Sequence, residues 1–310
     1  MLHTVTLNPA LDKTAIVKGF AVDVVNRVIE FREDPGGKGI NVSKAAAKLG
    51  TDSLAHALLA GHTGKKIELQ LKELGISVRP HEISGETRTN LKIVDPEKGT
   101  NTDVNEPGPT VSPEAFNAFT AELLADVNDG DVVIIAGSLP RGLEADAYGV
   151  LTSSLRQRGA KVFLDADGEP LRAALEARPH LIKPNDHELA GLVGHSFATV
   201  DDIAHAAQLL VAQGIERVVV SMGGKGALFA TSEQVLFARA PKIKVGSTVG
   251  AGDSVVAALA HAETTGMSPN EAARLAVATG SANAMCSGTQ AAEWAAIQAL
   301  LEQVTIEQIA

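Results

Sequence analysis

Gly250 and Gly252 stand just before Asp253 in the stretch Lys244–Ser254, which runs into the apolar segment Val255–Ala260. That segment is long enough for a buried helix, and the glycines let the backbone turn tightly in front of it. The first N–H groups of a helix have no partners within the helix, so such an end attracts anions. A carboxylate beside an anion cradle is what phosphoryl transfer requires of a base. The alternative is a helix cap, since aspartate is common where helices begin.

A second glycine-rich turn, Gly36–Gly39, is followed by Asn41 at the start of another predicted helix. The turn offers bare backbone, the cation of Lys38 and an amide, which together suit a phosphorylated, hydroxyl-rich ligand. Asp12 lies near a turn between two apolar strands, where it can accept hydrogen bonds from sugar hydroxyls. The alternatives are a plain loop-to-helix turn with a solvated lysine, and a strand-end aspartate on the surface.

The segment Lys183–Glu188 follows a predicted buried strand. Asn185 and Glu188 are three positions apart, so they are neighbours on one face of a helix. Oxygen ligands at that spacing suit hydrated Mg²⁺. The same pair also suits a helix N-terminus, with Asn185 as the cap and Glu188 at the third helical position. Both interpretations stay open at this point.

Another glycine turn, Ser221–Gly226, follows a predicted strand and either approaches a nucleotide or joins two strands of a hairpin. Arg88 and Arg141, the latter shortly after Ser138, are candidate anion clamps. Taken singly, each arginine is typical of a protein surface. Across these motifs, the glycine turns and the carboxylates are placed after predicted strands.

Several other motifs are absent from the sequence. It contains no G-x-x-x-x-G-K-[ST] loop, no H-E-x-x-H, no Cys–His spacing for zinc and no G-x-S-x-G elbow. The run Gly250–Gly252 lacks the third glycine of a dinucleotide fingerprint and lies far from the first strand. These absences argue against a P-loop enzyme, a structural zinc site and a nicotinamide oxidoreductase.

The composition excludes further classes. A net charge of −10 disfavours nucleic acid, and 3% aromatic residues leave little for base stacking. Cys286 is the single cysteine, which excludes an internal disulfide and fits a reducing, cytoplasmic compartment. The chain opens without a signal-peptide pattern, and no apolar run reaches about 18 residues, so we expect no membrane span.

We expect an α/β fold to position the candidate residues. Continuous apolar strands separated by helix-compatible segments are typical of a parallel sheet covered on both faces. Such strands are predicted over residues 131–136, 161–165, 180–183 and 217–221. Further strands are predicted over residues 2–7 and 51–60, and helices through 45–49, over 64–74, from 112, up to 158 and from the capping box at 268–271.

Four segments do not fit that alternation, because they mix apolar and charged residues as in a sheet exposed on one side. They cover residues 12–17, 28–34, 87–94 and 101–104, and the last two are predicted to form a hairpin. We expect a separate small sheet from about residues 11–35 and 87–106. It would be a lid over the carboxyl edge of the large sheet, where α/β proteins bind ligands. The whole chain, 1–310, is predicted to be a single domain.

Three of these motifs, taken in order, resemble those of the ribokinase-type (PfkB) carbohydrate kinases. They are Gly36-Gly37-Lys38-Gly39-x-Asn41, Lys183-Pro184-Asn185-x-x-Glu188 and Thr248-Val249-Gly250-Ala251-Gly252-Asp253. The segments 6–12, 85–90, 105–109 and 137–140 are similar to the phosphosugar branch, which contains 1-phosphofructokinases and tagatose-6-phosphate kinases. This resemblance spans essentially the whole chain. It implies a ribokinase-like three-layer sandwich with a mainly parallel sheet and a small β lid.

The resemblance also implies a role for each candidate residue. Asp253 would be the base, and the anion hole would be formed by Gly250, Ala251 and Gly252. Mg²⁺ would be organised by Asn185 and Glu188, while ATP would lie along Lys183, Asn185, Ser221, Gly223, Gly226 and Thr248. The sugar and its existing phosphate would be held by Asp12, Gly37, Lys38, Asn41, Arg88, Ser138 and Arg141.

Two further implications concern a second subunit and a second cation. Arg27 would reach a neighbouring subunit's site through the lid, which fits a homodimer. Some relatives also use K⁺ beside the anion hole. Asn283 and Cys286 fall near that place without forming a decisive ligand set.

The predicted activity is the ATP- and Mg²⁺-dependent phosphorylation of a ketohexose monophosphate to a bisphosphate. Fructose 1-phosphate, which gives fructose 1,6-bisphosphate, is the first choice because Thr89–Lys92 resembles 1-phosphofructokinases. Val25–Val28 instead resembles tagatose-6-phosphate kinases. Tagatose 6-phosphate and fructose 6-phosphate are therefore alternative substrates. A non-catalytic phosphosugar sensor is the alternative from another class.

Overall fold

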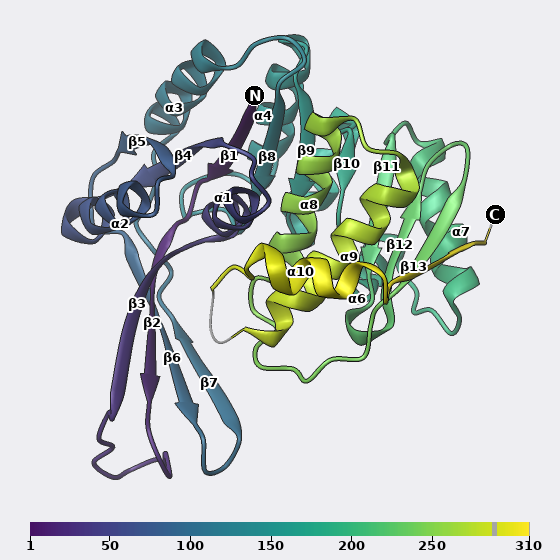
Figure 1. Ribbon diagram of the computed structural model, residues 1–310. Coiled ribbons are helices and arrows are strands. Elements are labelled where there is room, and N and C mark those ends of the chain that lie inside the picture. Colours follow the sequence, from purple (N-terminus) through teal and green to yellow (C-terminus); the bar gives the residue numbers. More distant parts are fainter. Residues whose placement is uncertain (287–289, 310) are drawn as a thin grey trace.

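The structure is a computed structural model that describes residues 1–286 and 290–309 (Figure 1). Over these residues the chain forms a ten-stranded sheet with helices on both faces, and a separate four-stranded sheet that projects away from it (Figure 1). The predicted three-layer sandwich with a mainly parallel sheet is therefore confirmed. None of the described helices is both long and apolar enough to cross a membrane.

The large sheet is parallel over most of its width and antiparallel at one edge. Its strands, in order across the sheet, are β14 (Thr305–Gln308), β13 (Val235–Arg239), β12 (Gly226–Ala230), β11 (Arg217–Ser221), β10 (Leu181–Ile182), β9 (Lys161–Asp165), β8 (Val132–Ala136), β1 (Leu2–Thr6), β4 (Ser53–Leu59) and β5 (Ser77–Glu82). The pairs from β11 to β5 are parallel, and those from β11 to β14 are antiparallel. The central strand β8 is buried along its whole length, which explains its continuous apolar sequence.

Helices cover both faces of this sheet. One face carries α1 (Lys38–Lys48), α2 (Gly61–Glu73), α8 (Ala251–Thr265), α9 (Pro269–Met285) and α10 (Trp294–Leu301). The other face carries α3 (Pro113–Asp126), α4 (Ala147–Gln157), α5 (Gly168–Ala174), α6 (Asp186–Val193) and α7 (Val200–Ala212). The capping box predicted for α9 is present: Ser268 Oγ accepts from the Glu271 N–H, and Glu271 Oε2 accepts from the Ser268 N–H.

The small sheet is built from the strands that did not fit the parallel pattern. Its order is β3 (Glu30–Gly36), β2 (Ala10–Ile16), β6 (Arg88–Asp95) and β7 (Thr100–Asn105). The strands β6 and β7 form the predicted antiparallel hairpin, while β2 and β6 run parallel. Every residue of β7 is exposed, because β7 is an edge strand that pairs with β6 on one side only.

The predicted elements differ from the structure mainly at the edges of the large sheet. The edge strand β5 was not predicted, because its sequence includes Pro80 and mostly polar residues, as edge strands permit. The strands β12, β13 and β14 were also missed, because each is only four or five residues long. Ser221–Gly226 joins β11 to β12, so the hairpin interpretation of that turn is correct. The strand predicted over residues 180–183 is shorter than expected, with two residues in β10.

Three buried histidines form a hydrogen-bonded chain across β1, β4 and β5. His3 Nδ1 lies 3.1 Å from His56 Nε2, and His56 Nδ1 lies 3.3 Å from His81 Nε2. Each end faces a carboxylate, with Asp131 3.4 Å from His3 Nε2 and Glu122 of α3 2.7 Å from His81 Nδ1. Burial lowers the pKa of all three rings despite these carboxylates, and that of His56 falls to about 3.

This histidine chain makes stability depend on pH. The unfolded chain takes up protons near pH 6.5, whereas the buried rings resist them, so the free energy of unfolding rises with pH. The neutral histidines therefore make their full contribution to the free energy of unfolding above pH 6.5. This contribution is lost as the pH falls below 6.5, by up to about 1.4 kcal/mol per pH unit for each histidine. Urea unfolding at about pH 8 and pH 5.5 measures this loss.

The matched variants are His56→Gln, which removes the central ring, and His62→Gln, which changes an exposed histidine on α2. We expect the first to reduce the pH dependence of the unfolding free energy and the second to leave it unchanged. An equal pH dependence in wild type and His56→Gln would contradict the assignment.

Candidate active site

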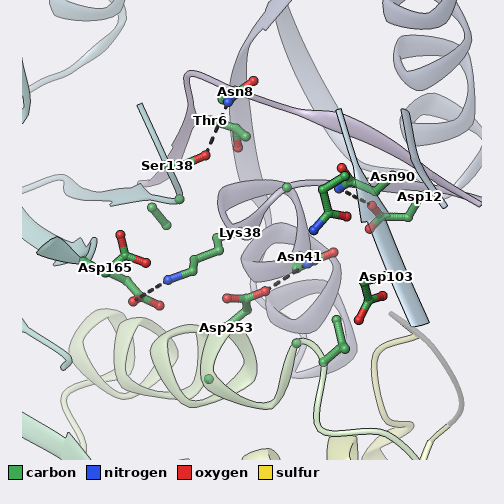
Figure 2. Close-up of a pocket in the computed structure, with 18 of the residues that line it drawn as sticks. Thr6, Asn8, Asp12, Lys38, Asn41, Asn90, Asp103, Ser138, Asp165 and Asp253 are labelled. Carbon is green, nitrogen blue, oxygen red and sulfur yellow. Dashed lines mark hydrogen bonds and ion pairs between the residues drawn. The ribbon is translucent and has the colours of Figure 1, made fainter. Parts of the chain in front are cut away.

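The carboxyl ends of the parallel strands and the facing side of the small sheet enclose a cavity of about 550 Å³ (Figure 2). This is the edge where α/β sheets place ligands. Most of the predicted site residues line it, although they come from distant parts of the chain. They are Asp12, Gly37, Lys38, Asn41, Arg88, Ser138, Lys183, Asn185, Glu188, Ser221, Gly250, Gly252 and Asp253.

A second cavity, of about 320 Å³, adjoins the first and contains the remaining glycine-turn residues. It is lined by the predicted residues Gly223, Gly226, Thr248 and Ala251. Asn185, Ser221 and Gly252 line both cavities, so the two spaces meet at these residues. Much of the remaining lining is apolar, including Ile243, Val255 and Val277. One chamber is therefore polar and charged, and the other suits a flat apolar group.

Two of the predicted arginines lie outside both cavities. Arg141 is exposed, and its Nη2 donates to the Gly108 carbonyl at 2.7 Å, so it fastens a loop instead of facing the cavity. Arg27 is exposed in the connection between β2 and β3.

The two residues considered for a cation also line neither of these two cavities. Asn283 Nδ2 donates to the Val249 carbonyl at 3.1 Å, and so holds the loop that precedes α8. Cys286 Sγ lies 3.6 Å from the Ala282 carbonyl, in the last turn before the undescribed residues 287–289.

Asp253 occupies the third position of α8 and is buried. The N-cap is Gly250, which has a φ of 78° that favours glycine and contributes no side-chain cap. Asp253 is thus not the cap, and the N-cap residue offers no side-chain acceptor to the first N–H groups of α8. Asn41 Nδ2 donates to Asp253 Oδ2 at 2.9 Å (Figure 2).

The protonation of Asp253 is set by its surroundings. Burial, followed by the negative charge of Asp165, raises the pKa of Asp253 to about 6, against the opposing effects of Asn41, Lys38 and Lys183. A carboxylate with a pKa near 6 is ionised at neutral pH and still basic enough to take a proton. Asp253 therefore has the chemistry of a general base.

Asp165, at the end of β9, was not among the predicted site residues. Its Oδ1 lies 3.3 Å from Lys38 Nζ (Figure 2). The same oxygen lies 3.5 Å from Lys183 Nζ, so one carboxylate joins two lysines. Its Oδ2 is buried without a hydrogen-bond partner among the described residues. Carboxylates including Asp165 and Asp253 raise the pKa of Lys38, although burial alone would lower it. The signal was present, since Asp165 is a charged residue at the carboxyl end of a buried parallel strand.

The small sheet contributes polar groups on the opposite side of the cavity. Asn90 Nδ2 donates to Asp12 Oδ1 at 3.0 Å, and burial raises the pKa of Asp12. A Cβ at Gly36 would lie 2.1 Å from Asp12 Oδ2, so any larger residue at position 36 would clash with this carboxylate. Arg88 Nη2 donates to the Asn8 carbonyl at 2.9 Å, while its Nε is buried without a partner among the described residues. Several lining residues here escaped the sequence analysis: Asn8, Asn90, Lys92 and Asp103.

Asn185 and Glu188 form the capping box of α6, so the structural alternative for this motif is correct. Asn185 Oδ1 accepts from the Glu188 N–H and Glu188 Oε2 accepts from the Asn185 N–H, both at 2.8 Å. Both side chains also line the charged cavity. Over the described residues no cluster of three His, Cys, Asp or Glu side chains could hold a metal alone.

The site thus combines a buried carboxylate at the start of α8 with two lysines around one polar cavity, an arrangement that suits an α/β phosphotransferase. Comparison with known proteins identifies the group more narrowly. The pfkB family carbohydrate kinase profile matches residues 6–296, and the chain belongs to this family. Kinases of this family use ATP and Mg²⁺.

Individual relatives match this chain over nearly its whole length. The chain is 40% identical over 309 residues to the 1-phosphofructokinase of Bacillus subtilis (strain 168), with 100% of both proteins covered. It is 36% identical to the 1-phosphofructokinase of Haemophilus influenzae, with 99% of this chain and 98% of the relative covered. Among solved structures, phosphofructokinase-2 from Escherichia coli in complex with potassium has a TM-score of 0.93 at 33% identity, covering 97% and 98% of the two chains.

Proposed function

We propose that the protein is a kinase that transfers the γ-phosphoryl group of ATP to fructose 1-phosphate, giving fructose 1,6-bisphosphate and ADP. The observation that carries this proposal is the buried Asp253 at the uncapped start of α8, facing one cavity with Lys38 and Arg88. The names of the relatives support the choice of sugar, because several 1-phosphofructokinases match nearly the full length of the chain. The reducing, cytoplasmic compartment predicted from the lone cysteine is part of this proposal.

In this proposal the sugar lies between the small sheet and the start of α1. Asp12 accepts hydrogen bonds from sugar hydroxyls, and Asn41 and the backbone at Gly37 hold the hydroxyls nearer α1. The existing phosphate faces Arg88, whose guanidinium supplies several donors in a fixed plane, and Ser138. The small sheet then acts as a lid that keeps water from the reacting groups.

During transfer, Asp253 takes the proton of the substrate hydroxyl while that oxygen attacks the γ-phosphorus. The bond from the γ-phosphorus to the oxygen bridging to the β-phosphate breaks, and ADP leaves with that oxygen. The N–H groups of Gly250, Ala251 and Gly252 stabilise the charge that develops on the transferring group. Lys38 and Lys183 offer cations on the other side of the same space.

The nucleotide fits the pair of adjoining cavities. Its base would occupy the apolar cavity beside Gly223, Gly226 and Thr248, and its phosphates would pass Ser221 and Asn185 toward the charged cavity. Asn185 and Glu188 would hold Mg²⁺ directly or through water. The ion supplies charge neutralisation on the phosphates.

The raised pKa of Asp253 predicts how kcat/KM depends on pH. Because the pKa of Asp253 is raised to about 6, kcat/KM is expected to be level above pH 7 and to fall about tenfold per pH unit below pH 6. Steady-state rates from about pH 5 to pH 8, with the pH stability of the protein measured separately, test this expectation. An acid limb near pH 4, the ordinary range of aspartate, would contradict it.

A kinetic panel tests the choice of substrate. Fructose 1-phosphate, fructose 6-phosphate and tagatose 6-phosphate are each assayed with ATP, and their kcat/KM values are compared. The proposal expects the highest value for fructose 1-phosphate. A clear preference for either 6-phosphate would overturn the substrate while leaving the chemistry in place, and no ADP release with any of them would overturn the kinase assignment.

We further infer a homodimer formed through the small sheet. Large apolar side chains are exposed there and in its connecting loop: Val22, Val25, Val28, Phe31 and Val104. Such a cluster is typical of a protein interface. Arg27 lies among them and would reach the partner's cavity. A related E. coli phosphofructokinase-2 forms a tetramer in one solved structure. Light scattering should give twice the chain mass, and Val25→Asp with Phe31→Asp should give the single chain mass.

A further inference from the structure

Lys44 lies on α1, one turn beyond Asn41, and lines neither of the two cavities described above. Its Nζ donates to Asn41 Oδ1 at 3.3 Å and to the Pro35 carbonyl at 3.1 Å. Asn41 in turn donates from Nδ2 to Asp253 Oδ2 at 2.9 Å. A continuous path of hydrogen bonds therefore leads from the end of β3 through Lys44 and Asn41 to the carboxylate of Asp253.

The chemistry of this path allows only one orientation of the Asn41 amide. An asparagine side chain has an oxygen that only accepts and a nitrogen that only donates. The Lys44 ammonium can only donate, and the ionised Asp253 carboxylate can only accept. Both partners are satisfied when Oδ1 faces Lys44 and Nδ2 faces Asp253. The flipped amide would set its oxygen against a carboxylate and its NH₂ group against an ammonium.

Charged groups from several elements surround Lys44. Asp34 and Arg32 belong to β3, Asp12 to β2 and Asp253 to α8. Burial lowers the pKa of Lys44, and the three carboxylates oppose this effect. The cation thus sits among acids that include both the proposed base and a proposed sugar ligand, at the junction where β3 of the small sheet leads into α1.

We propose that Lys44 is a positioning residue: it fixes the amide of Asn41, which holds the Asp253 carboxylate in the orientation that removes the proton from the substrate hydroxyl. This inference rests on the proposed function, in which Asp253 is the base. Lys44 touches neither substrate nor nucleotide, so its effect should fall on the chemical step.

The test compares Lys44→Met and Lys44→Arg with the matched control Lys48→Met. Lys48 lies one turn further along α1 and pairs with Glu293 at 2.5 Å, away from both cavities. We expect Lys44→Met to lower kcat by about 10- to 100-fold, because small misplacements of a catalytic group have effects of this size. The KM values for both substrates should stay within about twofold. Lys44→Arg should recover most of the activity, and Lys48→Met should match wild type.

Two further readouts separate positioning from a general structural effect. Loss of the hydrogen bond from Asn41 should raise the pKa of Asp253, so the acid limb of the kcat profile should move to higher pH in Lys44→Met. In an Asn41→Ala background, Lys44→Met should have no additional effect on kcat, because the residue through which it acts is gone. If Lys44→Met does not fold, Lys44→Gln provides the same comparisons with a neutral polar side chain.

The outcomes distinguish this inference from the proposed function. Suppose that wild type and Lys48→Met are active, and that Lys44→Met has the same kcat and the same acid limb as wild type. This result would overturn the role of Lys44 and leave the kinase assignment in place. Additive effects of Asn41→Ala and Lys44→Met would overturn it as well. An inactive wild type would overturn the kinase assignment, and with it this inference.

Discussion

Replacing Asp253 with asparagine is expected to lower kcat by about 10²- to 10⁴-fold, with little change in the KM of either substrate. Asparagine keeps the shape of the side chain but cannot take a proton at neutral pH. Folding should not suffer, because burial and the nearby charge of Asp165 already disfavour the ionised form of Asp253. Release of ADP, followed with fructose 1-phosphate and ATP at saturation, measures kcat, and urea unfolding measures stability.

The control for this variant is Glu271→Gln, because Glu271 holds the same third position in α9, outside both cavities. It should cost some stability through the capping box and leave kcat unchanged. Retention of more than about a tenth of the wild-type kcat in Asp253→Asn would contradict its role as the base. A wild type that binds phosphosugar without releasing ADP would instead favour the sensor alternative.

Arg88→Ala is expected to raise the KM for fructose 1-phosphate by about 10- to 150-fold, which corresponds to one charged hydrogen bond of roughly 1.5–3 kcal/mol. The guanidinium of Arg88 is held by the backbone carbonyls of Asn8 and Glu106, and its Nε is buried without a partner among the described residues. A buried donor with no acceptor is costly unless a ligand supplies one. The KM for ATP should change little, because Arg88 lies on the small sheet.

Arg141→Ala is the matched control, since Arg141 is exposed and donates to the Gly108 carbonyl. It should leave the KM for the phosphosugar within about twofold of wild type. A larger effect of Arg141→Ala than of Arg88→Ala would assign the phosphate contact to Arg141 instead. Arg88→Lys, which keeps the charge but not the planar fork, should fall between alanine and wild type.

The large sheet and the main site motifs could be predicted because their signals are local. A run such as Val132–Ala136 is apolar throughout because both of its faces are covered, and glycine turns mark the places where backbone approaches a ligand. The prediction for Asp253 rested on the order of three motifs along the chain. The structure brings residues of all three motifs into one cavity.

Other features depend on contacts that no local pattern encodes. Asp165 looked like the last residue of a buried strand, and its partner Lys38 lies 127 positions away. Arg141 carried the same signal as Arg88, yet it donates to the Gly108 carbonyl and does not line the cavity. The roles of Asn185 and Glu188 were left open because one pair of side chains can cap a helix and face a ligand, and the structure shows that they do cap α6.

The separation of 212 positions between Asn41 and Asp253, which share a hydrogen bond, has a consequence for synthesis. Ribosomes add about 5–20 residues per second, so roughly 10–40 seconds pass between the emergence of α1 and that of α8. During this interval the sheet face that Val256 and Leu259 will cover has no partner. Chaperones that bind apolar surface are therefore expected to meet the growing chain in this window. A chain released before α8 would lack both Asp253 and the helix that covers this part of the core.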